Sequence, residues 1–337
     1  MRRTLTRREF IRLAAVSAAG AILAGCAPEQ TLPSDVPVTS TDQPPAPAGS
    51  PAADGLPSSR PEPTQPRAGE AYLAVVHGPD PAQITKAALD ALGGIERFVK
   101  SGADVIIKPN ICTDYHPFEY AATTNPIVVA TLVTLALGAG AKRVRVMDYP
   151  FGGSPDSAYA ISGIADAVQA AGGEMHVMSQ PKYQTYDIEG ARSMRSARVY
   201  PDIMEADVLI NVPIAKHHGS ARLTLGAKNL MGVVLDRNIM HMSLHKRIAD
   251  LNSLVRPTLT LIDGVRILMD NGPTGGDLND VKQLDTVIAS HDLVCADAYA
   301  TGWFGITPSD VAYIEACAEL GLGNSDWKSV KLEEISL

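Results

Sequence analysis

The stretch DVIIKPN at residues 104–110 joins an apolar run of strand length to a lysine, a proline and an asparagine. The arrangement recurs: VLINV at 208–212 comes before KHHG at 216–219, and LTLI at 259–262 comes before Asp263. Longer segments with helical patterns separate these runs, and some of them begin with a proline just after a residue that can cap a helix. Strands that alternate with helices in this way predict an α/β fold, with a mostly parallel sheet and helices on both faces.

The alternation of strands and helices extends over residues 70–337, which we expect to form one α/β domain of Rossmann-like layered architecture. Strands are predicted at residues 72–76, 104–108, 143–147, 175–178, 208–212, 259–262, 286–289 and 330–335, and helices at 81–99, 126–138, 157–171, 237–251, 293–303 and 308–320. In such sheets, ligand sites form at the carboxyl ends of the strands. Polar clusters follow four of these strands, so we predict a crevice site at that edge.

The charge of the chain is unevenly distributed. The 337 residues carry 29 Lys and Arg against 37 Asp and Glu, a formal charge of −8, with 45% hydrophobic residues. This composition excludes a disordered chain, and the net acidity argues against nucleic acid as a partner. Residues 211–247, however, contain six basic residues and Asp236 as the only acid. We interpret this segment as a site for a small anionic ligand; the alternative is a solvated basic surface.

The N-terminus has the pattern of an export signal. Thr6-Arg7-Arg8-Glu9-Phe10 resembles a twin-arginine motif, and an apolar run too short to span a bilayer follows it. The run ends in Leu-Ala-Gly-Cys26, which resembles a lipoprotein cleavage box. We therefore predict a signal peptide at residues 1–25, lipidation of Cys26 and a lipid anchor in the membrane. Removal of the five arginines and one glutamate of this signal changes the formal charge from −8 to −12.

Residues 26–69 are expected to be a spacer between the anchor and the domain. Residues 27–69 hold 11 of the 24 prolines and almost no large apolar side chains, so they cannot bury enough surface to offset their ordering entropy. The predicted location is the outer side of the cytoplasmic membrane, or the periplasm or cell envelope. A redox protein or a membrane protein is a further possible partner there.

Histidines and lysines supply the candidate chemistry. His241 and His245 are spaced i, i+4, so on one helix they share a face. This spacing suits a divalent metal, catalysis or hydrogen bonding to a ligand; the alternative is that the pair has only a surface or core role. Lys216 and His218 place a cation beside a group that titrates near neutral pH. The predicted catalytic residues are Lys216, His218, His241 and His245, and the predicted cofactor- or ligand-binding residues are Lys108, Asn110, Lys228, Asn229 and Asp263.

The order of these motifs resembles that of the family catalogued as domain of unknown function 362. The resemblance extends over nearly all of residues 70–337 and rests on KPN at 108–110, TNP at 124–126, INVP at 210–213, GAKNLMG at 226–232, the two histidines ahead of IADL at 248–251, DG at 263–264, NGP at 271–273, and Asp292 and Asp297. Some relatives carry ferredoxin-like modules, which implies redox chemistry. A shorter stretch, NVP followed by KHHG, is similar to the nickel-pincer lactate racemase group, which would place Lys216, His218 and a later histidine around an organometallic cofactor.

Together these patterns lead to a functional hypothesis. We expect a cofactor-dependent enzyme of redox or isomerase type that acts on a small anionic substrate, with a divalent metal or an organic cofactor. The alternative is a solute- or metal-binding lipoprotein that delivers cargo to a membrane partner. Apart from Cys26 the chain has only Cys112, Cys295 and Cys317, too few for the four thiolates of an iron–sulfur cluster, so no intrinsic cluster is expected.

Overall fold

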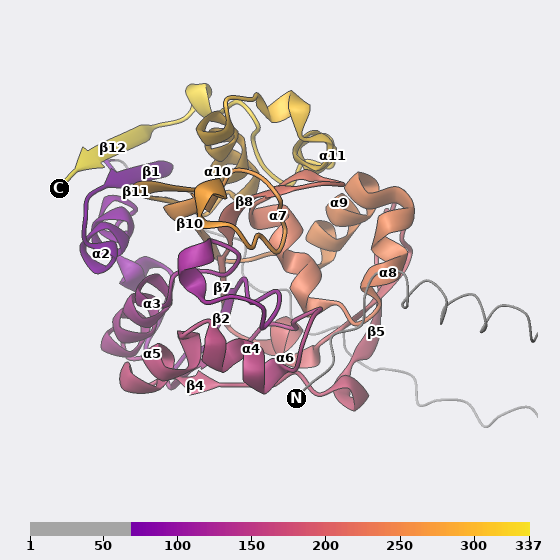
Figure 1. Ribbon diagram of the computed structural model, residues 1–337, viewed down its shortest axis with the longest axis horizontal. Coiled ribbons are helices and arrows are strands. Elements are labelled where there is room, and N and C mark those ends of the chain that lie inside the picture. The colour runs from indigo at the N-terminus through magenta and orange to yellow at the C-terminus, as the bar shows by residue number, and fades with distance from the viewer. Residues whose placement is uncertain (1–68) are drawn as a thin grey trace, which may run out of the picture. The chain divides into compact units, whose positions relative to one another are not determined.

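The computed structural model describes residues 69–337, and within them the chain forms a ten-stranded sheet with helices on both faces (Figure 1). The strand order is β12-β1-β11-β10-β7-β2-β3-β4, with β8 added beside β10 and β9 beside β8. Along this order β11 is antiparallel to β1 and β10, and the other pairs are parallel. The predicted α/β architecture with a mostly parallel sheet is therefore confirmed.

All eight predicted strands exist. The sheet strands are β1 (Leu73–His77), β2 (Asp104–Pro109), β3 (Arg143–Val146), β4 (Glu174–Met175), β7 (Val208–Val212), β8 (Ile214–His218), β9 (Arg222–Thr224), β10 (Leu259–Leu268), β11 (Val281–Ser290) and β12 (Leu332–Ser336), and a separate hairpin pairs β5 (Gln184–Asp187) with β6 (Ser196–Val199). The pleat divides each central strand between two cores. In β1, for example, Leu73 and Val75 belong to one apolar cluster, and Ala74 and Val76 belong to the other.

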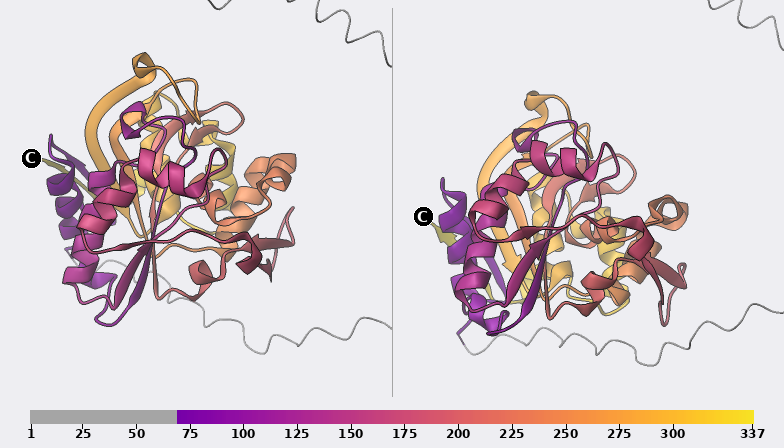
Figure 2. Two further views of the ribbon diagram at one scale, coloured as in Figure 1. Left: turned by 60° about the horizontal axis from the view of Figure 1, so that its bottom comes forward. Right: turned by 90° about the horizontal axis from the view of Figure 1, so that it is seen from below.

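The helices cover the two faces separately. They are α2 (Pro81–Ala91), α3 (Pro126–Gly138), α4 (Pro155–Ile161), α5 (Ile164–Ala170), α6 (Pro201–Glu205), α7 (Gly226–Asn229), α8 (Arg237–Met240), α9 (Leu244–Leu254), α10 (Leu293–Ala300) and α11 (Ala312–Glu319). Helices α2, α3 and α5 lie on one face, and α7, α9, α10 and α11 lie on the other (Figures 1 and 2).

Two of the predicted helices are each divided into two α-helices in the structure. Gly163, with a φ of 73°, separates α4 from α5, because the left-handed conformation it adopts interrupts the helix. Residues 237–251, predicted as one helix, form α8, the short 3₁₀ segment His241–Ser243 and α9. The prediction that His241 and His245 share one helix face is therefore wrong. Ser243, with a φ of −154°, breaks the helical path between them.

The strands that position the polar clusters lie side by side. Parallel pairing of β3, β2, β7 and β10 brings their carboxyl ends to one edge of the sheet. After β7 the chain does not leave this edge. Pro213 is followed at once by β8, which pairs with β10 and folds back into β9. This hairpin, which was not predicted, carries Lys216 and His218.

The predictions for the N-terminal part remain expectations. The signal peptide, Cys26 and the spacer lie outside the described residues, apart from the last residue of the spacer. In the described part of the chain, none of the helices has the length and apolar character needed to cross a bilayer.

Candidate functional site

A cavity of about 370 Å³ opens at the carboxyl edge of the sheet. Seven of the nine predicted site residues line it: Lys108, Asn110, Lys216, His218, Lys228, Asn229 and His241. They come from β2, β8, α7 and the 3₁₀ segment after α8, so segments more than 100 residues apart meet there. His245 and Asp263 do not line the cavity. Its volume lies in the range typical of sites for small molecules.

The base of the cavity is built on an ion pair between Lys108 and Asp148. Lys108 Nζ lies 2.8 Å from Asp148 Oδ1, and both side chains are buried. The same ammonium donates to the carbonyl of Pro109 and to Asn229 Oδ1. Burial lowers the pKa of Lys108 to about 8, and the adjacent Asp148 carboxylate opposes this shift. Three acceptors use all three ammonium protons, so Lys108 supplies charge to the cavity rather than a free donor.

Backbone amides hold the Asp148 side chain in position. Its carboxylate accepts hydrogen bonds from the amides of Ile111 and Tyr149, at 2.6 and 2.9 Å. Gly232 leaves the space that the pair needs, because a Cβ at this position would lie 2.0 Å from Asp148 Oδ1 and 2.6 Å from Lys108 Nζ. Close approach of the backbone therefore requires glycine here.

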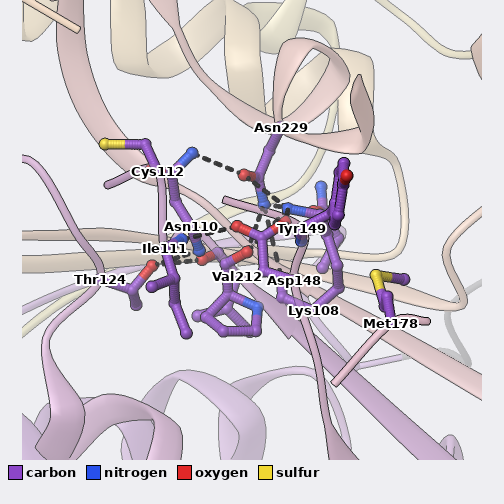
Figure 3. Close-up of polar contacts among 12 residues, drawn as sticks. Lys108, Asn110, Ile111, Cys112, Thr124, Asp148, Tyr149, Met178, Val212 and Asn229 are labelled. Carbon is purple, nitrogen blue, oxygen red and sulfur yellow. Dashed lines mark hydrogen bonds and ion pairs between the residues drawn. The ribbon is translucent and has the colours of Figure 1, made fainter. Parts of the chain in front are cut away.

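Three amide side chains form a continuous hydrogen-bonded chain. Asn110 Nδ2 donates to Asn229 Oδ1 at 2.8 Å (Figure 3). Asn229 Nδ2 donates to Asn211 Oδ1, also at 2.8 Å. Asn211 Nδ2 in turn donates to the carbonyl of Gly226. Since each amide has one acceptor end and one donor end, this chain fixes the orientation of all three.

Lys216 begins the amide chain. Its ammonium donates to Asn110 Oδ1 at 2.9 Å and lies within hydrogen-bond distance of Cys112 Sγ and of the carbonyls of Ala122 and Pro273. Its side chain is buried, and its donors are already used. We therefore revise the role expected for Lys216: it organises the site and contributes positive charge, and it is not positioned as a proton donor to a ligand.

Lys228 differs from the other two lysines. It lies in α7, is 9% exposed and lines the cavity. No described residue accepts a hydrogen bond from its ammonium, although this part of the protein is densely hydrogen-bonded. Burial lowers the pKa of Lys228 to about 7, and the positive charge of Lys216 adds to this shift.

Helix α7 is held in place by a buried carboxylate. Asp297 accepts hydrogen bonds from the amides of Gly226 and Ala227, at 2.6 and 2.9 Å. A Cβ on Gly226 would lie 2.7 Å from Asp297 Oδ1, so this contact excludes larger residues. Burial raises the pKa of Asp297 to about 7. The carboxylate thus fixes the short helix that presents Lys228.

His218 is a neutral hydrogen-bond donor. Its Nδ1 accepts hydrogen bonds from the amides of Ser220 and Ala221, at 3.1 and 3.2 Å, so the ring hydrogen is on Nε2. Burial lowers the pKa of His218 to about 3, and the charges of Lys228 and Lys216 act in the same direction. The expectation that His218 carries protons near neutral pH is therefore wrong, because protonation of Nδ1 would break both contacts.

The remaining predicted residues divide between two environments. His241 and His245 are both exposed, but His241 lines the cavity and His245, on α9, does not. Asp263 is buried away from the cavity lining and accepts hydrogen bonds from the amides of Asn125 and Val265. Burial raises the pKa of Asp263 to about 6. We assign Asp263 a structural role, since it fixes the start of α3 to β10.

The predicted metal site at His241 and His245 does not fit the surroundings. Among the described residues, no three His, Cys, Asp or Glu side chains are grouped as metal ligands. The cavity wall carries Lys108, Lys216, Lys228 and Arg237 but a single carboxylate, Asp148, which is already paired. An excess of positive charge repels a divalent cation and attracts an anion.

Arg237 and Cys112 also line the cavity and were not predicted as site residues. The Arg237 guanidinium lies 4.7 Å from the ring centroid of Tyr149 and donates to the carbonyl of that residue. Its position in the basic segment, residues 211–247, was the feature of the sequence that could have identified Arg237 as a site residue. Cys112 Sγ lies 3.4 Å from Lys216 Nζ. Its position two residues after KPN at the end of β2 was the only sign of a place in the site.

Comparison with known proteins gives a family and a relative. Residues 105–302 match the family described as Domain of unknown function (DUF362). A thylakoid-associated protein of Synechocystis sp. is 29% identical over 249 residues, which cover 69% of this chain and 73% of the relative.

Two solved structures were also found. The lactate racemase apoprotein from Thermoanaerobacterium thermosaccharolyticum has a TM-score of 0.40 and 13% identity, over 73% of this chain and 56% of that one. A protein from Thermotoga maritima has a TM-score of 0.38 and 14% identity, over 73% and 60% of the two chains. The chain thus spans little more than half the length of the racemase chain.

Proposed function

The chain belongs to the DUF362 family, as the motif order predicts, and from its cavity we propose that it is an enzyme that transforms a small carboxylate substrate. The observation that carries this proposal is Lys228, a buried lysine without a protein partner among the described residues, in a cavity with four cationic side chains and one carboxylate. Such a cavity favours an anion.

The cations divide into two groups with different roles. Lys108 and Lys216 are saturated by protein acceptors and contribute a fixed positive potential. Lys228 and Nη1 of Arg237 donate to no described residue, so they are available to a ligand. We expect the substrate to contact these two groups, with its carboxylate at Nη1 of Arg237, because charge-assisted hydrogen bonds in a buried site are the stronger ones.

The reactive group is Lys228. A pKa of about 7 means that ammonium and free amine coexist near neutral pH, which suits a group that gives or takes protons. The neutral His218 offers Nε2–H to an oxygen that gains negative charge during the reaction. A neutral imidazole can stabilise such an oxyanion by hydrogen bonding without transferring its proton. These roles support the isomerase type of reaction, with proton transfer at a carbon next to a carbonyl.

Hydrogen–deuterium exchange tests this function. The purified full-length chain is incubated in D₂O with small 2-oxo carboxylates, and loss of the proton next to the carbonyl is followed by NMR. We expect exchange with the native chain and none with Lys228→Met. The matched control is Lys246→Met, which removes an exposed lysine of the same basic segment and leaves exchange unchanged. Equal exchange by Lys228→Met and the native chain would contradict the proposal. Tight binding without any exchange would favour a solute-binding protein instead.

We also propose that the enzyme works at a membrane, anchored through Cys26 on the outer side. The motifs at residues 6–12 and 23–26 support this location, and the Synechocystis relative is described as thylakoid-associated. Fractionation tests it: the native chain should be found with membranes and Cys26→Ser in the soluble fraction. A native chain found only in the soluble fraction would contradict the anchor.

A further inference from the structure

We propose that Lys228 forms a Schiff base with the carbonyl carbon of a 2-oxo carboxylate bound in the cavity. This inference rests on the proposed function and names its substrate class and its covalent intermediate. It follows from a difference among three buried lysines that line one cavity: Lys108, Lys216 and Lys228.

The first argument is the availability of the nitrogen. A lysine is a nucleophile only as the free amine, and an ammonium that donates three hydrogen bonds to fixed acceptors does not release a proton readily. Lys108 has three such acceptors, one of them the Asp148 carboxylate 2.8 Å away. Lys216 has the carbonyls of Ala122 and Pro273 and Oδ1 of Asn110 within 2.9 Å. Lys228, which also lines the cavity, has none among the described residues, so its nitrogen is unengaged.

The second argument is electrostatic. Burial and the neighbouring charges of Lys216, Arg237 and Lys108 all favour the uncharged form of Lys228. A lysine desolvated beside another cation is a recurrent way to obtain a nucleophilic amine at neutral pH. Cys112 is the other potential nucleophile of the cavity, but its sulfur lies 3.3 Å from the carbonyl of Ala122 and 3.4 Å from Lys216 Nζ, so both neighbours already engage it.

The third argument is the match to a 2-oxo carboxylate. Its carboxylate fits the free Nη1 of Arg237, and its neutral carbonyl fits the free amine of Lys228 and Nε2–H of His218. Because His218 is held neutral by the amides of Ser220 and Ala221, it can donate to the carbonyl oxygen while that oxygen gains charge. A simple anion without a carbonyl would bind the cations of the cavity, but it would have no group for the free amine of Lys228 and the neutral donor of His218 to contact together.

The covalent step balances without another reactant. The amine nitrogen attacks the carbonyl carbon, a C–N bond forms, and the C–O π electrons move to oxygen, which takes a proton from the nitrogen. The hydroxyl oxygen of this carbinolamine takes up the proton that the ammonium released to water before the attack, the C–O bond breaks, the oxygen leaves as water, and the nitrogen lone pair completes the protonated C=N bond. From the ammonium form of Lys228 and the carbonyl, the products are the protonated imine and one water molecule. No oxidant or reductant is needed.

Borohydride trapping tests the inference. The full-length chain is mixed with pyruvate as the probe and reduced with sodium borohydride, and the modified peptide is located by mass spectrometry. We expect one reduced adduct, on Lys228, and none on Lys108 or Lys216. In Lys228→Arg, which keeps the charge, the adduct should fall to background while pyruvate still protects the chain against heat. Lys246→Met should form the adduct as the native chain does.

The outcomes separate this inference from the proposed function. Pyruvate that stabilises the native chain against heat but gives no adduct would overturn the Schiff base and leave an anion-binding active site. Neither stabilisation nor adduct would contradict both. An adduct spread over exposed lysines, or one that survives in Lys228→Arg, would overturn the assignment to Lys228. The position of the adduct in the native chain does not depend on whether any variant folds.

Discussion

Asn110 Nδ2 donates a 2.8 Å hydrogen bond to Asn229 Oδ1, and this contact joins two buried side chains 119 residues apart. Asn110 follows β2, and Asn229 ends α7, so the contact links the edge of the sheet to the segment that carries Lys228. The same oxygen of Asn229 accepts from Lys108 Nζ at 3.0 Å. One amide therefore connects the ion pair at the base of the cavity to the amide chain that begins at Lys216.

Replacement of Asn229 should destabilise the fold. In Asn229→Ala, the buried Lys108 ammonium and the Asn110 amide each lose an acceptor, which costs about 2–4 kcal/mol for a charged and a neutral donor together. Urea unfolding followed by circular dichroism measures the change. Asn238→Ala is the matched control, since Asn238 is exposed at the cavity rim, and we expect it to cost less than about 0.5 kcal/mol. Equal stability of the two variants would contradict the assigned network.

The ion pair can be tested by a double replacement. Asp148→Asn leaves the buried Lys108 ammonium without its carboxylate, and we expect a loss of about 3–5 kcal/mol. Lys108→Met in the same chain removes the uncompensated charge, so Asp148→Asn with Lys108→Met should be more stable than Asp148→Asn alone. Chemical unfolding of the native chain, the two single variants and the double variant gives the coupling free energy between the two side chains. A coupling near zero would show that the two side chains do not stabilise each other.

Gly232 provides a steric test of the same pair. A methyl group at this position meets Asp148 Oδ1 at 2.0 Å and Lys108 Nζ at 2.6 Å, so Gly232→Ala must displace one of them. We expect a loss of about 1–3 kcal/mol, typical of overpacking, and weaker binding of carboxylates. Gly219→Ala is the control because no atom lies within 4 Å of its added methyl group. Thermal unfolding and calorimetric titration with a carboxylate measure both effects, and an unchanged Gly232→Ala would contradict the close approach.

Much of this arrangement could be predicted from the sequence, because it depends on strand order and chain direction. The run DVIIKPN ends a buried strand, and parallel neighbours bring the residues after each strand to one edge. Lys108, Asn110 and Lys228 were placed in the site for that reason and because of the local positive charge. Asp263 shows the limit of the argument. It was expected just after a strand that ends at residue 262, but β10 continues to Leu268, and the Asp263 carboxylate accepts hydrogen bonds from the amides of Asn125 and Val265 instead of lining the cavity.

The hydrogen-bond partners and the protonation of each side chain could not be predicted, because they depend on contacts between distant segments. Lys216 and Lys228 look alike in the sequence, yet Lys216 meets the carbonyls of Ala122 and Pro273, whereas Lys228 meets no acceptor among the described residues. The tautomer of His218 likewise depends on a turn that brings two amides to Nδ1. Helical spacing predicted that His241 and His245 would act together, but the break before α9 separates them.

His218 should not titrate in the physiological range. Its pKa is lowered from 6.5 to about 3 by burial and by the charges of Lys228 and Lys216. The unfolded chain takes up a proton here at higher pH than the folded chain does. The contribution to stability is therefore fully present above about pH 6.5 and is lost as pH falls toward about pH 3. NMR of ¹⁵N-labelled histidine should show Nε2–H and an unprotonated Nδ1 throughout the neutral range. A midpoint near the ordinary value would contradict the neutral donor.

Anion binding should weaken as the solution becomes basic. Burial lowers the pKa of Lys228 from 10.5 to about 7, so in the free protein the ammonium is complete below that pH and is lost above it. If a carboxylate binds the ammonium form, its affinity is constant at lower pH and falls by up to about tenfold per pH unit above about pH 7. A non-reacting carboxylate such as acetate isolates this effect from covalent chemistry, and calorimetric titration measures it. In Lys228→Arg the cation persists, so the fall in affinity between about pH 7 and pH 8 should disappear while binding remains; above about pH 8 the loss of charge on Lys108, whose pKa is about 8, acts in both chains. Affinity that rises with pH in the native chain, or the same pH dependence in Lys228→Arg, would assign the titrating group elsewhere.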